Sequence, residues 1–186
     1  AGIRPSNLEN RDLRWERNQT ANIGIDYALF NGRIYGSFDV FERTTNDLLL
    51  FQPLPVTNGF GGFTSNIGQL KNRGLEIEIN SINVNKGDFK WATNFNITFI
   101  DNEVTRLFDN NQVLPGNNSI RIGQPVGTIV TTRYMGVNPA TGRPMFQDRF
   151  GNLVYQPIFA RDAQIVGNTF SEIFGGLTNT FSYKGI

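Results

Sequence analysis

The chain has 186 residues and a formal net charge of +1, so it is long enough for one domain with a sizeable core. Its charge gives no electrostatic footprint for nucleic acid or acidic lipid. The absence of Cys and His excludes disulfides, Ser-His-Asp and Cys-His catalysis, and the usual zinc and copper ligand sets.

The content of 16 Phe and 20 Gly, together with many Asn, is typical of an all-β chain with long polar loops. No apolar run reaches the ~20 residues of a membrane helix. A β-strand crosses the same bilayer with ~10 residues of alternating polarity, so membrane insertion stays open. No signal peptide opens the sequence, which leaves a cytoplasmic protein or an internal piece of a longer chain.

A long hairpin is predicted around Asn31-Gly32, between strands at about 14–30 and 33–50. Asn-Gly between alternating apolar residues favours a two-residue turn, because both positions need positive φ. If these two residues form the turn, Ile25 faces Phe38, and every pair on that side is apolar or glycine. A slip of one residue would mix the two faces, so the pattern also fixes the register.

The same alternation predicts three further strands, at about 72–82, 89–107 and 169–183. Long loops are expected at 44–70 and 108–168, and the second includes a small hairpin that pairs 145–147 with 153–155. Short turns at 31–32, 83–88 and from 184 onward alternate with these loops. All short turns therefore lie at one end of the strands and all long loops at the other, as in bacterial outer-membrane barrels.

Each predicted strand has one apolar and one polar face. We expect the apolar face to point towards lipid; its candidates are Ile23, Ile25, Tyr27, Leu29, Phe38, Val40, Leu75, Ile77, Ile79, Trp91, Phe95, Ile97, Phe99, Phe181 and Tyr183. The candidates that face the lumen are Asn22, Asp26, Asp39, Glu76, Glu78, Asn80, Asn94 and Asn96. Tyr27, Trp91 and Tyr183 fall near the short turns, where an interfacial aromatic girdle belongs.

A soluble β-sandwich, acting as a carbohydrate-binding or adhesin-like module, is the alternative. In that fold the apolar faces of Ile25 and Phe38, and of Ile77 and Phe95, would pack on each other or on a second sheet. In a barrel wall, nothing from this chain would cover them.

Ten short motifs follow one another along the chain. They are Leu13-Arg-Trp-Glu16, Ile23-Gly-Ile-Asp26, Gly36-Ser-Phe-Asp39, Thr44-Thr-Asn-Asp-Leu48, Leu54-Pro55 with Gly59-Phe60, Asn66-Ile-Gly68, Asn72-Arg-Gly-Leu-Glu76, Gly136-Val-Asn-Pro-Ala-Thr-Gly142, Phe146-Gln-Asp148 and Asn179-Thr-Phe-Ser-Tyr-Lys-Gly185. Together they resemble the barrel of SusC/RagA-type TonB-dependent transporters, over almost the whole chain and in family order.

The resemblance implies a non-enzymatic importer in the outer membrane of a Gram-negative bacterium. Such transporters form a large barrel closed by a plug, work with a SusD-like lipoprotein, and import glycans, peptides or similar oligomers with energy from TonB. The plug and the TonB-interacting segment have no counterpart in these residues. Because such barrels have ~22 strands and five cannot close, we expect residues 1–186 to be a segment from the C-terminal half of a longer barrel, cut at a short turn.

The candidate chemical sites have simpler explanations. Glu76 and Glu78 lie two positions apart on one face of a strand, a spacing that could suit the paired carboxylates of a glycoside hydrolase. A water-filled lumen lined by polar side chains explains them better. Asp148–Asn152 and Asp109–Asn111 contain oxygen donors without the full calcium-loop pattern, so turn chemistry is the better explanation. We expect no metal and no cofactor.

Two groups of loop residues keep a second interpretation. Phe60 and Phe63, in a Gly-rich run, are expected to pack against neighbouring loops, although exposed aromatics would also suit sugar faces or a lid protein. The arginines of the last long loop are read as solvated charges, with anionic substrate or lipopolysaccharide as the alternative: Arg121, Arg133, Arg143, Arg149 and Arg161.

Overall fold

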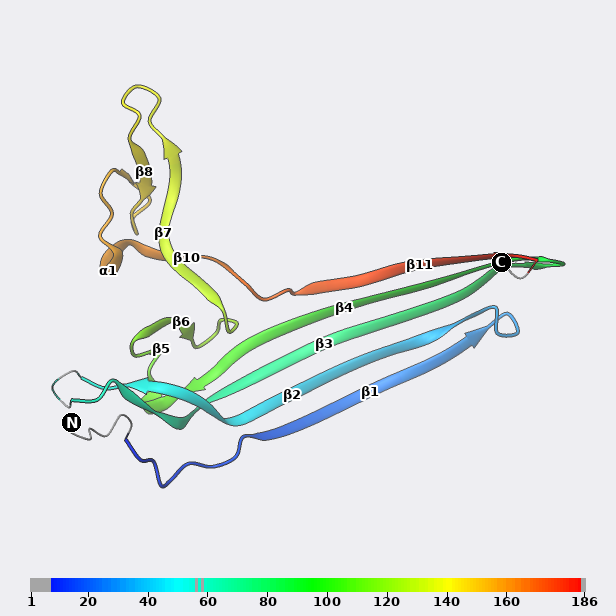
Figure 1. The fold of residues 1–186 in the computed structure, drawn as a ribbon, viewed down its shortest axis with the longest axis horizontal. Coiled ribbons are helices and arrows are strands. Elements are labelled where there is room, and N and C mark those ends of the chain that lie inside the picture. Colours follow the sequence, from blue (N-terminus) through cyan, green and yellow to red (C-terminus); the bar gives the residue numbers. More distant parts are fainter. Residues whose placement is uncertain (1–7, 56, 58, 185–186) are drawn as a thin grey trace, which may run out of the picture.

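Five long strands form one antiparallel sheet in the order β1-β2-β3-β4-β11 (Figure 1). The computed structural model describes residues 8–55, 57 and 59–184. The strands are β1 Arg17–Leu29, β2 Ile34–Pro53, β3 Gly62–Lys86, β4 Phe89–Leu107 and β11 Ile173–Tyr183. The all-β prediction is confirmed, and the sheet is open, with β1 and β11 as its edges.

The first turn contains the predicted Asn31-Gly32 pair. Asn31 and Gly32 have φ of 55° and 79°, as a hairpin turn of this kind requires, and the Arg33 N–H donates to the Phe30 carbonyl at 3.3 Å. Phe30, before them, also has a positive φ of 55°, which the sequence does not predict. The register that follows places Ile25 opposite Phe38, as the sequence predicts.

The loop predicted at 44–70 is wrong in its extent. β2 continues to Pro53 and β3 begins at Gly62, so the two strands pair well beyond the end of β1 and leave only 54–61 as the connection. Register shifts near Asn46, and Asp47 with φ of 57°, let the ladder continue past an irregular point. The strand predicted at 72–82 is therefore the middle of a much longer one.

The second turn is also shorter than predicted. The sequence places a turn at 83–88, but β3 reaches Lys86 through a register shift between Ile82 and Val84, and only two residues separate it from β4. β4 has the predicted bounds, whereas β11 begins at Ile173 rather than at 169. The turn expected from 184 onward lies mostly outside the described residues, since these end at 184.

The segment predicted as the loop 108–168 contains short elements of its own. They are η2 Phe108–Asn110, β5 Val113–Leu114, β6 Asn117–Arg121, β7 Thr128–Val137, β8 Pro144–Gln147, β9 Leu153–Val154, α1 Phe159–Asp162 and β10 Ala163–Asn168. The predicted small hairpin is present, with Phe146 opposite Val154 and Gln147 opposite Leu153. We call residues 128–168, with their sheet β10-β7-β8-β9, the lobe.

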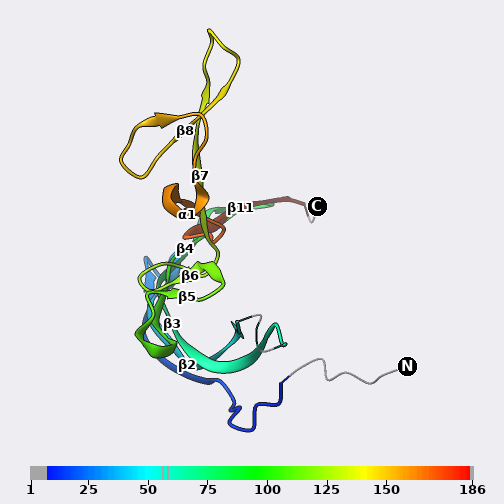
Figure 2. The same ribbon diagram turned by 90° about the vertical axis from the view of Figure 1, so that its left-hand side faces the viewer.

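The lobe stands away from the five-stranded sheet, which curves in an arc (Figure 2). The short turns and the C-terminal end of β11 lie at the opposite end of the sheet from the lobe (Figure 1). A small apolar core lies near the long connections, where Ile67, Val104, Leu107 and Leu114 are buried. In the described part of the chain, no helix is long and apolar enough to cross a membrane.

Candidate functional site

The backbone register brings the predicted apolar residues side by side across the whole sheet. Val40 pairs with both Ile23 and Leu75, and Leu75 pairs with Phe99. The next row on this face contains Ile25, Phe38, Ile77 and Ile97. The row after it contains Tyr27, Gly36, Ile79, Phe95 and Leu177. Because each row joins residues from successive strands, the apolar face is continuous over the sheet.

No described part of the chain covers this apolar face. Ile23 is 77 % exposed, Ile25 66 % and Phe38 43 %, and the buried apolar side chains of the described residues all lie elsewhere. Ile77 and Trp91 are half-buried by their neighbours within the sheet. A sandwich would bury these residues against a second sheet, so the structure gives that alternative no support.

Aromatic side chains gather at the short-turn end of the same face. Trp91 and Phe181 stack with ring centroids 5.5 Å apart, and the Trp91 Nε1–H donates to the Asn179 Oδ1 at 3.0 Å. Tyr183 pairs with Phe89 in the adjacent row. Trp91 thus packs its ring against an apolar neighbour and keeps its N–H partnered, which is the chemistry of Trp at a membrane–water interface.

Charged side chains bound the apolar face at the other end. Lys71 Nζ lies 3.0 Å from Glu42 Oε1, and Arg73 Nη2 lies 3.3 Å from Glu103 Oε2. From Phe89 to Phe99 the strand rises by about 33 Å, which at a tilt of about 40° gives a height of about 25 Å. That height equals the apolar band of outer-membrane barrels, ~25 Å.

The opposite face has the predicted polar side chains. Asn94 Nδ2 donates to Asn80 Oδ1 at 2.8 Å and to Glu78 Oε1 at 3.3 Å, and Asn80 Nδ2 donates to Glu78 Oε1 at 2.9 Å. Asn96 pairs with Glu78 in the backbone register, and Asp39 with Glu76.

Aromatic and apolar residues interrupt this polar face. Asn22 pairs with Phe41, whose ring lies over Gly74, and Phe174 pairs with Thr98. Among the described residues, the four carboxylates Asp26, Asp39, Glu76 and Glu78 are in no ion pair. The face therefore offers hydrogen-bonding groups and negative charge to water or to a neighbouring domain, without an arranged acid and base.

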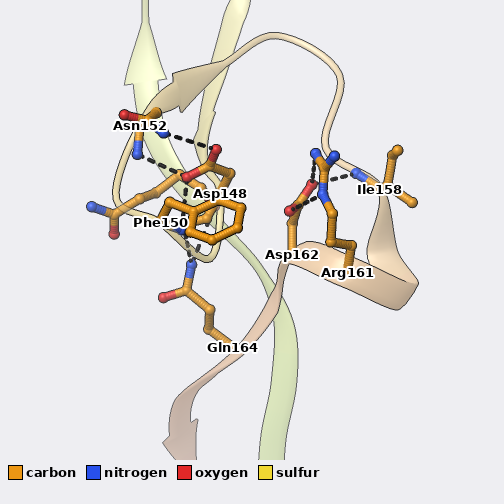
Figure 3. A network of polar contacts seen from close by, with 8 residues as sticks. Asp148, Phe150, Asn152, Ile158, Arg161, Asp162 and Gln164 are labelled. Carbon is orange, nitrogen blue, oxygen red and sulfur yellow. Dashed lines mark hydrogen bonds and ion pairs between the residues drawn. The ribbon is translucent and has the colours of Figure 1, made fainter.

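The Asp148–Asn152 segment is a side-chain-stabilised turn in the lobe (Figure 3). The Asp148 carboxylate accepts hydrogen bonds from the N–H groups of Phe150 and Asn152, at 2.9 and 2.8 Å. Burial raises the pKa of Asp148, but the hydrogen bonds from Asn152 and Phe150 outweigh it and hold the pKa below its ordinary value. Its hydrogen bonds make this segment a turn held by the Asp148 side chain, and the described residues contain no group of three or more acidic side chains able to hold a metal.

A second carboxylate in the lobe is fully buried. Asp162 accepts from Arg161 Nε at 2.7 Å and Nη2 at 2.9 Å, and from the Ile158 N–H at 2.8 Å (Figure 3). The Arg161 hydrogen bonds lower the pKa of Asp162 to about 2, and the pKa of Arg161 rises correspondingly. Arg161 is therefore a structural partner, whereas the sequence grouped it with the solvated arginines.

Phe60 and Phe63 occupy different places. Phe63 lies inside β3 opposite Gln52 and helps to line a hollow of about 380 Å³ with Leu13 and Phe51. Phe60 lies in the 54–61 connection and is half-buried. A contact of either ring with a sugar or a lid protein stays a prediction.

Sequence reasoning missed two features of the structure. One is the pairing of an aromatic ring with a glycine on the next strand, as Tyr27 covers Gly36 and Phe41 covers Gly74. An aromatic residue in register with a glycine was the signal available for it. The other is the Arg161–Asp162 network, for which adjacent opposite charges gave no signal of burial.

The family model described as "TonB dependent receptor-like, beta-barrel" matches residues 2–184. TonB-dependent receptor SusC of Bacteroides thetaiotaomicron is 34 % identical over 191 residues, which cover 94 % of this chain and 19 % of that protein. TonB-dependent receptor P39 of Formosa agariphila is 30 % identical over an aligned length of 232 residues, which covers 99 % of this chain and 22 % of that protein.

Solved structures agree with these sequence relatives. The RagAB peptide transporter superposes with a TM-score of 0.87 at 27 % identity, covering 99 % of this chain and 21 % of that one. The RagAB peptide importer in its "open-open" state gives a TM-score of 0.85 at 27 % identity. The chain thus spans about a fifth of the length of the relatives that it matches.

Proposed function

Because the chain belongs to the TonB dependent receptor-like β-barrel family, we propose that it is part of the wall of an importer in the outer membrane of a Gram-negative bacterium. The observation that carries the proposal is the continuous apolar face, exposed across five strands and about as tall as a bilayer core. In the parent protein this face meets lipid. The wall holds and shapes the pathway and carries out no covalent chemistry.

The polar face lines the lumen in this proposal. Asn80, Asn94 and Glu78 form a hydrogen-bonded strip there, with the carboxylates of Asp26 and Asp39 beside it. Water, or the plug domain of the parent protein, forms hydrogen bonds with these amide and carboxylate groups. The two open edges, β1 and β11, pair with further strands of the same barrel, because unpaired backbone groups are costly in lipid.

The imported nutrient is an oligomer, either glycan or peptide, in this proposal. A peptide is named for the RagAB structures, and the sequence relatives include SusC. A SusD-like lipoprotein works with the importer at its outer end, and TonB drives it through the N-terminal part of the parent. Uptake of labelled peptides and labelled glycans by cells with and without the intact transporter separates the two nutrient classes.

Single cysteines in the full-length transporter test the orientation of the wall. The native segment has no Cys, so Ile77→Cys and Glu78→Cys place one thiol on each face of β3. In cells or lipid vesicles, a water-soluble maleimide should label Glu78→Cys and leave Ile77→Cys unlabelled. The reverse pattern would show that the apolar face is not in lipid, and the barrel proposal would then be abandoned.

A further inference from the structure

A groove of about 640 Å³ lies on the apolar face of the sheet, at the edge away from the short turns. One wall of the groove is the apolar row of Val40, which continues across the sheet to Ile173. The other wall is the next row on the same face, which contains Ala21, Glu42, Arg73 and Asp101. Because side chains alternate along a strand, the residues between the two rows contribute their backbone as the floor. The groove therefore has one apolar wall and one charged wall.

Arg73 keeps most of its hydrogen-bonding capacity at the charged wall. Its Nη2 donates to Glu103 Oε2 at 3.3 Å, and its Nε lies 3.7 Å from Glu42 Oε2, beyond hydrogen-bonding distance. The Arg73 side chain is 52 % exposed. A guanidinium group has five N–H donors in a planar fork that matches a phosphate. Two carboxylates thus hold Arg73 in place, and it still offers donors to a phosphate in the groove.

Asp101 supplies the opposite charge on the next strand. It lies opposite Arg73 in the backbone register, is exposed, and belongs to no ion pair among the described residues. Neighbouring strands lie ~4.8 Å apart, which is close to the separation of phosphate and ammonium in a phosphoethanolamine group. A phosphate alone would leave an unpaired carboxylate beside it, whereas a group that also carries an ammonium pairs with both side chains.

The apolar wall is suited to acyl chains. Val40 and Ile173 are both more than half exposed, and no described part of the chain covers them. A water-soluble ligand would leave this wall bare. The charged wall has two carboxylates and one guanidinium group, so it does not attract a purely anionic lipid from a distance. The two walls together match a lipid with a zwitterionic headgroup.

We propose that the groove binds a lipid whose headgroup carries both a phosphate and an ammonium group, as in phosphatidylethanolamine. The phosphate accepts hydrogen bonds from Arg73, the ammonium donates to Asp101, and the acyl chains lie along the apolar rows. The proposal rests on the proposed function, which places the apolar face in lipid and the charged wall at the outer surface of the membrane.

Native mass spectrometry of the full-length transporter tests this lipid site. The protein is purified in detergent, freed of bound lipid, and offered equal amounts of phosphatidylethanolamine and phosphatidylglycerol. Phosphatidylglycerol has the same phosphodiester and acyl chains but no ammonium group. The variants are Arg73→Gln, Arg73→Lys and Asp101→Asn. Arg43→Gln is the matched control, because Arg43 is an exposed arginine at the same level of β2 whose position in the strand belongs to the opposite face.

The wild type should retain about tenfold more phosphatidylethanolamine than phosphatidylglycerol, the factor expected for one hydrogen bond to a charged group. Asp101→Asn should remove most of this preference, because the ammonium loses its partner. Arg73→Gln should lower the retention of both lipids, Arg73→Lys should restore part of it, and Arg43→Gln should behave as the wild type. Soluble phosphoethanolamine should displace neither lipid, because it lacks acyl chains. Band shifts on unheated gels verify that every variant barrel is folded.

Equal retention of the two lipids by the wild type, or a preference for phosphatidylglycerol, would overturn the inference. Unchanged retention in both the Arg73→Gln and the Asp101→Asn variants would overturn it too, as would displacement of the lipid by soluble phosphoethanolamine. The cysteine labelling of Ile77→Cys separates these failures from that of the proposed function. An unlabelled Ile77→Cys with any of these results removes only the lipid site, whereas a labelled one shows that the proposed function itself has failed.

Discussion

Gly36 and Gly74 of the sheet each lie beneath an aromatic side chain of the neighbouring strand, with no room for a side chain of their own. A Cβ at Gly36 would collide with the carbonyl oxygen of Glu78 and with the hydroxyl of Tyr27. The same holds for Gly74, where the ring of Phe41 occupies the space. In both pairs the ring covers the backbone that the glycine exposes, a device that stabilises glycine-containing strands.

We therefore expect Gly36→Ala to destabilise the full-length transporter by about 1–3 kcal/mol, the usual cost of overpacking. Gly176→Ala is the control, because a Cβ there meets only the Asn96 side chain, at 3.7 Å. The urea midpoint of refolding into lipid vesicles measures both. Equal midpoints for the two variants would show that Tyr27 and β3 move aside freely.

The buried carboxylate of the lobe predicts a pH response. The pKa of Asp162 is about 2 in the folded lobe and near 3.8 when it is free of Arg161. A carboxyl group whose pKa is depressed by folding contributes stability above the unfolded pKa and loses it as the pH falls through the folded pKa. The lobe should therefore be intact above pH 4 and weaken progressively between about pH 4 and pH 2.

Cleavage by pepsin within residues 128–168 of the full-length transporter measures this loss. Asp162→Asn, which cannot pair as an anion with Arg161, should be cleaved faster than the wild type at pH 4, and its cleavage should depend less on pH. Glu9→Gln is the control, because its ion pair with Arg11 is exposed and lies far from the lobe in sequence. Identical pH profiles for Asp162→Asn and the wild type would contradict the structural role of the pair.

The first hairpin depends on its turn. Gly32 has φ of 79° and no atom within 4 Å of a Cβ placed on it, so a substitution there changes backbone strain and nothing else. Gly32→Ala should cost about 1–2 kcal/mol, the penalty of a left-handed conformation for an L-residue. Gly61→Ala, with equal open space and no positive φ, should be near neutral in the same vesicle refolding measurement.

The extent of β2 and β3 shows where reasoning about a single element fails. Pro53, Pro55 and the glycines at 59–62 favour a loop over 44–70, since proline cannot donate to a ladder and glycine weakens strands. The structure places Pro53 at the last pair of the ladder, opposite Gly62, where β1 no longer runs alongside. Pairing with β3, rather than local propensity, decides how far β2 continues.

At the scale of the whole molecule, the two faces predict opposite responses to charge. Ile77→Arg puts a cation on the apolar face near the middle of its rows, and we expect it to destabilise the folded barrel by about 2–4 kcal/mol. Glu78→Arg, one position along β3, points to the polar face and should cost less than half of that. Refolding of the full-length transporter into vesicles gives both values, and a larger cost for Glu78→Arg would reverse the assigned faces.

The sequence by itself determined the hairpin register, the two faces and the all-β class. Alternation at Ile23–Leu29 and Ile34–Val40, with Asn31-Gly32 between them, permits only one pairing that keeps the faces separate. Those are local properties of adjacent residues. The Tyr27–Gly36 contact belongs in part to this group, since the register already places the two opposite each other.

Only the tertiary structure decided how far the strands extend, and that residues 128–168 form a lobe with its own sheet and a buried Asp162–Arg161 pair. The physical reason is the distance along the chain between the groups involved. Strand ends depend on partners tens of residues away, and the buried Asp162 carboxylate also accepts a hydrogen bond from the Arg149 backbone, which belongs to a different turn of the lobe. No local pattern in the sequence encodes those neighbours.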